Sequence, residues 1–135
     1  VTLGALTGRA RHLEQARAYV EQVHHELTTQ PMALGHLWLA ADSLLDGAAE
    51  VSVVGTRDAM APFVKMLNTT YLPTLAVHRH ENGTAVAPVA REVLEGRPVR
   101  GDVAAYLCRS FACQAPVSTM NDFVALLAPL GRVVG

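Results

Sequence analysis

The sequence has no excess of charge of either sign. Its 135 residues include 11 basic and 12 acidic side chains, which give a formal net charge of −1. Proteins that bind nucleic acid or anionic membranes through their overall charge need a surplus of basic side chains. We therefore expect neither a nucleic acid nor a membrane as a partner.

Long apolar runs and cysteines are also scarce. No stretch approaches the roughly 20 apolar residues that span a bilayer, and residues 1–6 lack the regions of a secretion signal. Two cysteines are too few for the disulfide framework of a small secreted protein. A soluble, cytoplasmic protein is therefore expected. Because no initiator Met is present, we also expect Val1 to begin an excised or processed segment.

Short motifs of well-known catalytic sites are absent from the sequence. It contains no Walker loop, no G-x-G-x-x-G, no H-E-x-x-H and no nucleophile elbow. Half of the residues are hydrophobic, which excludes a disordered chain and is enough for one domain with a core. We expect a globular chain that needs no cofactor.

Residues 1–47 are predicted to form a helical hairpin. Apolar residues recur three and four positions apart from Leu13 to Leu27, and Pro31 suits the first turn of a second helix over about residues 32–45. Apolar side chains surround this second helix, which predicts burial on most sides. One partner helix and a small α/β unit are not expected to supply that cover. We therefore expect the hairpin to pack in a larger helical layer or across an oligomer interface.

Residues 48–135 are predicted to form a small α/β domain. The β-branched run at residues 50–54 is typical of a strand, and an amphipathic helix follows it and ends before Tyr71. A second strand is expected over residues 74–78. Strand, helix and strand in this order predict a βαβ unit.

The rest of this domain is predicted to contain a β-hairpin and a last helix. The expected elements are a short helix at 88–95, strands at 103–108 and 112–117, and a helix at 121–130 capped by Ser118 or Thr119. Pro116 places the second strand of the hairpin at an edge of the sheet or at its own end. The predicted fold class is therefore α/β (α+β), a helical hairpin followed by a βαβ unit, a β-hairpin and a carboxy-terminal helix.

Cys108 and Cys113 are the most distinctive candidate site residues. Their C-x4-C spacing differs from the C-x-x-C of thioredoxin-type redox helices. Across a tight hairpin, the two sulfur atoms come within disulfide range if their side chains share one face. Two free cysteines buried as small hydrophobic residues are nevertheless the favoured interpretation, because the cytosol is reducing, and the disulfide is the alternative.

A zinc site is a further alternative for the same cysteines. His78 and His80 are two residues apart on a predicted strand, so their imidazoles point to one face. Together with Cys108 and Cys113 they match the ligand types of a tetrahedral zinc site, although the spacing fits no usual finger or ribbon. No metal is expected as the primary interpretation.

Gly55 and Thr56 form a weaker candidate site. They follow a predicted strand and precede a predicted helix, where free N–H groups can bind an anion. The same pattern is common in α/β units, in which it only caps the helix.

One segment resembles a known family. Residues 105–117, AYLCRSFACQAPV, are similar to the carboxy-terminal end of the DUF255 family of thioredoxin-domain-containing (YyaL-like) proteins. The order of a helical hairpin, the VSVVG segment at 51–55, the Tyr-Leu-Pro at 71–73 and a Gly-bearing loop is similar as well.

The resemblance implies a parent protein of several hundred residues. Such a parent has an amino-terminal thioredoxin-like domain and an (α/α)6 toroid of the six-hairpin glycosidase and N-acylglucosamine 2-epimerase kind. Residues 1–47 would be the last helices of that toroid, and residues 48–135 the carboxy-terminal domain. The thioredoxin-like C-x-x-C is absent from this chain, so no redox site carries over from it.

The expected function is a non-catalytic structural module. Its partners would be the thioredoxin-like domain and toroid of the parent, or a second copy of the chain. The parent's own activity, thiol-redox or carbohydrate-processing, is poorly defined. A thiol–disulfide redox module that uses Cys108 and Cys113 and a zinc-stabilised binding domain are the alternatives.

Overall fold

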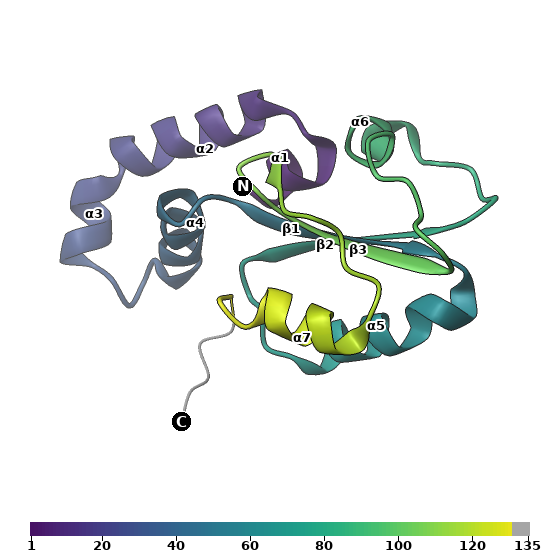
Figure 1. Cartoon of the computed structure of the whole chain (residues 1–135). Coiled ribbons are helices and arrows are strands. Elements are labelled where there is room, and N and C mark those ends of the chain that lie inside the picture. Colours follow the sequence, from purple (N-terminus) through teal and green to yellow (C-terminus); the bar gives the residue numbers. More distant parts are fainter. Residues whose placement is uncertain (131–135) are drawn as a thin grey trace.

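The computed structural model describes residues 1–130 and confirms the predicted mixed α/β fold. Amino-terminal helices precede a four-stranded mixed sheet, and a helix lies at the carboxy-terminal end (Figure 1). The last five residues of the predicted domain 48–135 lie outside the described residues. Within the described part, no helix is both long and apolar enough to cross a membrane.

The sheet has the strand order β2-β1-β3-β4. Strands β1 (Ala49–Gly55) and β2 (Leu75–Glu81) are parallel, and α5 (Arg57–Thr69) connects them, which confirms the predicted βαβ unit. Strand β3 (Val103–Arg109) is antiparallel to β1, and the short β4 (Ala112–Cys113) is antiparallel to β3.

Strand β1 is central, and all seven of its residues are buried. Successive side chains of a strand point to opposite faces of the sheet. Val51 and Val53 therefore face one layer of helices, whereas Glu50, Ser52 and Val54 face the other. The first of these faces is apolar, and the second contains a carboxylate and a hydroxyl group.

Helices α5 and α7 (Met120–Leu127) cover the apolar face and enclose the main core (Figure 1). Phe63 of α5 and Phe123 of α7 meet there, with ring centroids 4.9 Å apart. Thr119 caps α7, because its hydroxyl oxygen accepts a hydrogen bond from the Asp122 N–H at 3.2 Å. This confirms one of the two predicted caps.

The opposite face is covered by α1 (Thr2–Thr7), the 3-10 turn η1 (Pro88–Ala90) and α6 (Arg91–Leu94) (Figure 1). Ala5 of α1 packs with Ala48 and Ala76. The first helix, which the sequence did not reveal, therefore shares a core with the sheet. The predicted division of the chain at residue 48 stays a prediction.

Residues 10–45 form a helical extension at one end of the sheet (Figure 1). The single helix predicted from Leu13 to Leu27 is wrong, because the chain forms α2 (Ala10–Gln22) and α3 (His24–Thr29). The break occurs at Val23, whose ψ is 17°. A β-branched residue followed by two histidines has a low helix propensity, so little opposes the bend.

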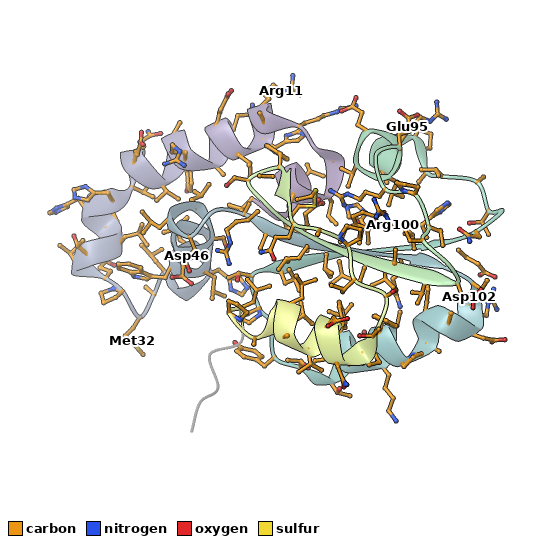
Figure 2. The ribbon with its side chains drawn as sticks, viewed as in Figure 1. Arg11, Met32, Asp46, Glu95, Arg100 and Asp102 are labelled. Atoms are coloured by element: carbon orange, nitrogen blue, oxygen red, sulfur yellow. A yellow bond between two sulfur atoms is a disulfide. The ribbon has the colours of Figure 1, made fainter. Side chains whose placement is uncertain are left out.

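The second helix of the extension, α4 (Gly35–Leu45), begins three residues later than predicted. The described residues do not bury this helix on most sides, and its predicted burial against a larger helical layer or a second copy stays a prediction. Trp38, Leu39 and Leu45 are 42%, 39% and 82% exposed, and Met32 projects from the loop that precedes the helix (Figure 2). The apolar side chains are present, but residues 1–130 do not cover them.

The second strand of the β-hairpin is shorter than predicted. Strand β4 ends at Cys113, and the following residues contact β3 through a hydrogen bond from Gln114 to Leu107 and a bridge between Ala105 and Val117. Pro116 has no N–H to donate to a ladder, which explains why regular pairing does not continue to Val117.

Candidate functional site

A disulfide joins Cys108 of β3 to Cys113 of β4. The two residues are partners in the register of these strands, and their Cα atoms lie 3.9 Å apart. The Gln114 N–H donates to the Leu107 carbonyl beside them at 2.9 Å. The cysteines thus form a cross-strand pair, the arrangement in which the side chains of neighbouring strands are closest.

The turn of this hairpin has an unusual backbone. Ser110 and Phe111 both have positive φ angles, 48° and 68°, as a two-residue turn of type I′ requires. Such turns favour Asn and Gly, and a bulky Phe at positive φ is strained. The Ser110 N–H donates to the Ala48 carbonyl at 2.9 Å, and the Arg109 guanidinium donates to the Asp46 carbonyl at 2.6 Å. These bonds hold the turn against the chain that enters β1.

A row of polar side chains lies on the sheet face next to the disulfide. In the register of the sheet, Glu50 is opposite Cys108, and Ser52 is opposite both His78 and Tyr106. Their side chains therefore share one face. Glu50, Ser52 and His78 are 2%, 0% and 8% exposed, so this polar row is buried.

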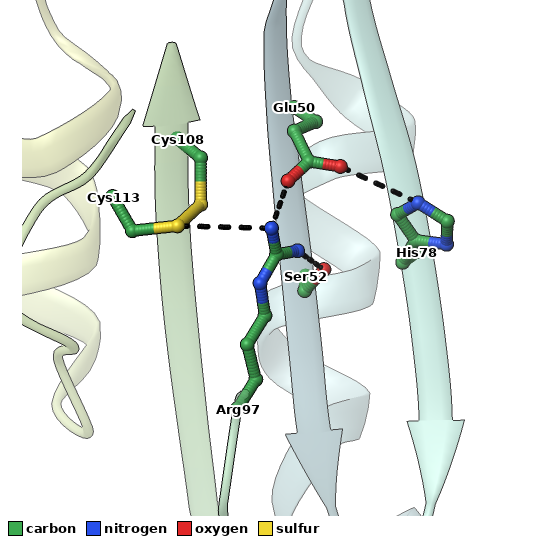
Figure 3. Close-up of a disulfide and its surroundings, with 6 residues drawn as sticks. All are labelled: Glu50, Ser52, His78, Arg97, Cys108 and Cys113. Carbon is green, nitrogen blue, oxygen red and sulfur yellow. Dashed lines mark hydrogen bonds and ion pairs between the residues drawn. A yellow bond between two sulfur atoms is a disulfide. The ribbon is translucent and has the colours of Figure 1, made fainter. Parts of the chain in front are cut away.

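Arg97, from the loop after α6, connects the polar row to the disulfide (Figure 3). Its guanidinium donates to Glu50 Oε1 and to Ser52 Oγ, and Nη2 lies 3.7 Å from Cys113 Sγ. The Arg97 and Glu50 side chains are both more than nine-tenths buried. A buried, hydrogen-bonded ion pair therefore lies directly beside the disulfide.

The second carboxylate oxygen of Glu50 faces His78. Glu50 Oε2 and His78 Nε2 are 3.4 Å apart, and neither atom has a hydrogen-bond partner within residues 1–130. A buried carboxylate oxygen without a hydrogen bond is costly. His78 is thus the nearest group that can replace Arg97 as the partner of Glu50.

A cavity of about 340 Å³ opens beside this cluster. Its walls include Glu50, Arg97, Tyr106, Phe111 and Cys113. The Tyr106 hydroxyl donates to the Pro98 carbonyl, which holds the loop containing Arg97 over the sheet. The cavity thus gives an outside molecule access to the disulfide, beside a fixed cation.

The residues of the predicted zinc site are only partly brought together. His78 lies on the same face as Cys108, but it contacts Glu50, and both thiols are used in the disulfide. His80 pairs in register with Val54, further along β2. Within residues 1–130, no group of three His, Cys, Asp or Glu side chains is placed to hold a metal ion. The zinc alternative stays a prediction for the reduced protein.

Gly55 and Thr56 lie at the other end of β1, away from the cysteines. Gly55 is opposite Val103, whereas Cys108 is opposite Glu50. Thr56 caps α5 by accepting a hydrogen bond from the Ala59 N–H at 3.4 Å, and its own N–H donates to the Asp102 carbonyl.

The cation nearest to this helix terminus is already paired. Arg57 lies 2.9 Å from Glu81, and the hydrogen bonds that its guanidinium donates to the Glu81 carboxylate raise the pKa of Arg57. The Thr56 hydroxyl is used as a cap, so the polar groups at this junction serve the fold.

Substitution of Gly55 by alanine is expected to lower the free energy of unfolding by about 1–3 kcal/mol. An added Cβ would lie 2.4 Å from the Asp102 carbonyl oxygen and 2.8 Å from the Val103 Cα, both in the backbone. Urea denaturation measures the loss. Gly35→Ala is the matched control, because its Cβ meets nothing within 4 Å. Equal stability of the two variants would contradict the close approach.

Glu50 and Arg97 are functional residues that the sequence did not reveal. Glu50 begins the EVSVV run, and period-2 alternation places Glu50 and Ser52 on one face of the expected strand. Two polar side chains on one face of a buried strand are a signal of a buried polar cluster. Arg97 stands in a loop with no local pattern, so nothing in the sequence connects it to Glu50.

No protein-family model matches the chain, and no curated protein matches it either. The function of the chain is therefore inferred from its own residues and contacts.

Proposed function

We propose that this chain is a structural module of a larger protein and that the helical extension packs against a layer of helices supplied by the rest of that protein. The observation that supports this function is the low burial of the extension. None of the 13 residues of α2 is buried, and α3 buries only Leu27. By contrast, every residue of β1 is buried.

The exposed side chains of the extension are the kind that a partner would cover. Tyr19, Met32, Trp38, Leu39 and Leu45 are all large, apolar and more than a third exposed. A helix with apolar side chains on several sides is normally buried on several sides. Exposed apolar side chains that are concentrated in one region are typical of a surface that binds another protein or domain.

The chemistry of the partner follows from the charge of the chain. A net charge of −1 provides little long-range attraction, so docking depends on apolar contact. Helices that pack on α2 and α4 with their own apolar side chains satisfy this requirement. The resemblance to the DUF255 family supports the same arrangement, since it implies that these helices complete an (α/α)6 toroid.

In this function the disulfide and the ion pair have a structural role. The disulfide closes the hairpin of β3 and β4, and Arg97 holds the loop after α6 on the sheet. Both stabilise the α/β part as a platform for the extension. No catalytic step is assigned to the module.

The purified chain is expected to self-associate or to bind a hydrophobic dye, because the extension lacks its cover. The double variant Leu39→Ser/Leu45→Ser is expected to weaken self-association by roughly 100-fold. Each buried leucine contributes about 1.5 kcal/mol or more, which corresponds to about tenfold in a dissociation constant. Analytical ultracentrifugation over a range of concentrations measures the change, and dye fluorescence provides an independent reading.

Val89→Ser is the matched control for this experiment. Val89 is 62% exposed but lies in η1, outside the helical extension, so its loss is expected to leave association and dye binding unchanged. A wild-type chain that stays a monodisperse monomer and binds no dye would contradict the proposed docking surface. Equal effects of the control and the double variant would contradict it as well.

A further inference from the structure

We propose that the Cys108–Cys113 disulfide is a site of thiol–disulfide exchange, and that an external dithiol attacks it at Cys113 Sγ through the adjacent cavity. The two cysteines, Arg97 and the cavity wall are the residues that define this site (Figure 3). The proposal does not depend on the helical extension. An experiment can therefore contradict the exchange site without contradicting the proposed docking function, and the reverse also holds.

The two sulfur atoms are not equivalent. Cys108 is 0% exposed and packs among Val54, Ala104 and Tyr106 on the central part of the sheet. Cys113 is exposed on the edge strand β4 and lines the cavity. Exchange requires access to the sulfur under attack. An incoming thiolate therefore reaches Cys113 Sγ, and Cys108 is the leaving group.

Arg97 gives the attacked sulfur a fixed positive neighbour. Its Nη2 lies 3.7 Å from Cys113 Sγ and is held there by Glu50, which is itself buried. A nearby cation attracts an anionic thiolate and stabilises thiolate over thiol. Glu50 and Glu92 also line the cavity, and the pair of Glu50 and Arg97 is neutral overall, so the attraction comes from the Nη2 N–H groups, which lie close to Cys113 Sγ.

The polar row can adapt to reduction of the disulfide. A thiolate on Cys113 competes with Glu50 for Nη2 of Arg97, because Nη2 contacts both groups. Glu50 Oε2 has no hydrogen-bond partner within the described chain, and His78 Nε2 lies 3.4 Å from it. His78 is thus placed to take over Glu50 when Arg97 turns to the thiolate. A merely structural disulfide does not need this second partner.

The exchange consists of two successive substitutions at sulfur. The first thiolate of the dithiol forms a bond to Cys113 Sγ, the Cys108–Cys113 bond breaks, and its electron pair leaves with Cys108 as a thiolate. The second thiolate then attacks the dithiol sulfur in this mixed disulfide and releases Cys113 as a thiolate. Two electrons pass from the dithiol to the protein, and the dithiol becomes a disulfide.

The strained turn contributes to reversibility. Ser110 and Phe111 keep positive φ angles between the two cysteines, and Phe111 forms part of the cavity wall. Hydrogen bonds from Ser110 and Arg109 to residues before β1 hold the turn independently of the sulfur atoms. The two thiols therefore remain opposite each other after reduction, and the disulfide can form again.

The first test reduces the native chain with dithiothreitol and follows free thiols by alkylation and mass spectrometry. An exchange site predicts that the rate rises in proportion to the dithiothreitol concentration without denaturant. A disulfide reached only through unfolding would instead be reduced at a rate that levels off at the unfolding rate or, where refolding is faster than reduction, at a rate that rises steeply with sub-denaturing urea. Either outcome would overturn the proposal.

The second test separates the two sulfur atoms. Cys108→Ser and Cys113→Ser each leave one thiol, and both are treated with glutathione disulfide. The Cys113 thiol is expected to form a mixed disulfide at least about tenfold faster than the Cys108 thiol. Equal rates, or faster reaction of Cys108, would overturn the assignment of the attacked sulfur. Circular dichroism identifies any variant that has lost its fold.

The third test removes the cation without leaving a buried charge unpaired. Glu50→Gln/Arg97→Met is compared with the wild type, which keeps the guanidinium and its partner. The double variant is expected to be reduced by dithiothreitol about tenfold more slowly than the wild type. Equal rates in the two folded proteins would overturn the role of Arg97.

Discussion

Replacement of Arg97 by methionine is expected to lower the free energy of unfolding by about 3–5 kcal/mol. The substitution leaves the Glu50 carboxylate buried, 2% exposed, without the guanidinium that neutralises it. Ser52 is neutral, and His78 faces only Glu50 Oε2, at 3.4 Å, so these two side chains offset only part of the loss of the bond from Arg97 to Oε1. Urea denaturation measures the loss as a shift of the midpoint.

Two comparisons identify the cause of this loss. Glu50→Gln/Arg97→Met removes both charges, and it is expected to recover most of the stability because no buried charge remains. Arg91→Met makes the same change in the exposed pair of Arg91 and Glu95, which are 4.0 Å apart. That change is expected to cost less than about 1 kcal/mol. A single variant that is as stable as the wild type would show that Glu50 and Arg97 are not a buried pair.

Much of the fold follows from local patterns. Residues 50–54 are β-branched and end at Gly55, and the helix after them has a clear apolar face, so the βαβ unit is visible in the sequence. The capped helix after Thr119 is visible for the same reason. In each case the spacing of the apolar residues and the residues at the ends of the element predict the same structure.

The features that the sequence did not show depend on contacts or on weak local preferences. The bend at Val23 has no strong breaker in the sequence, since neither Gly nor Pro occurs there. Helix α1 is six residues long, too short for a recognisable period. The exposure of α4 depends on what surrounds it in space. Helical periodicity shows which side chains need cover, but it does not show which molecule supplies the cover.

Only the part of the candidate site that lies on neighbouring strands was predictable from the sequence. Cys108 and Cys113 face each other because a two-residue turn sets their register, and that turn is local in sequence. Arg97 reaches Glu50 across 47 positions of the chain. Contacts of this range depend on how the loop after α6 crosses the sheet, which Tyr106 and Pro98 determine. The proximity of the two cysteines was therefore predictable, but the interpretation as free thiols was wrong, and the charged neighbour was not predicted.

Phe123→Ala is expected to lower the free energy of unfolding by about 3–5 kcal/mol. Phe123 is 0% exposed, and its ring packs against Phe63 at a tilt of 52°. It also belongs to the cluster formed by Val51, Val53 and Ala105 on the sheet. Truncation leaves a cavity between α7, α5 and the sheet that this small core cannot fill by relaxation. Urea denaturation gives the loss.

Val124→Ala is the matched control, since Val124 is the next residue on α7 and is 49% exposed. Its truncation is expected to change the stability by less than about 1 kcal/mol, because little buried area is lost. Hydrogen exchange should then show that Phe123→Ala exposes the amides of α7 and α5 before those of β1. If the two variants lost equal stability, α7 would not be anchored by Phe123. Contacts other than that of Phe123 would then have to hold α7 on the apolar face of the sheet.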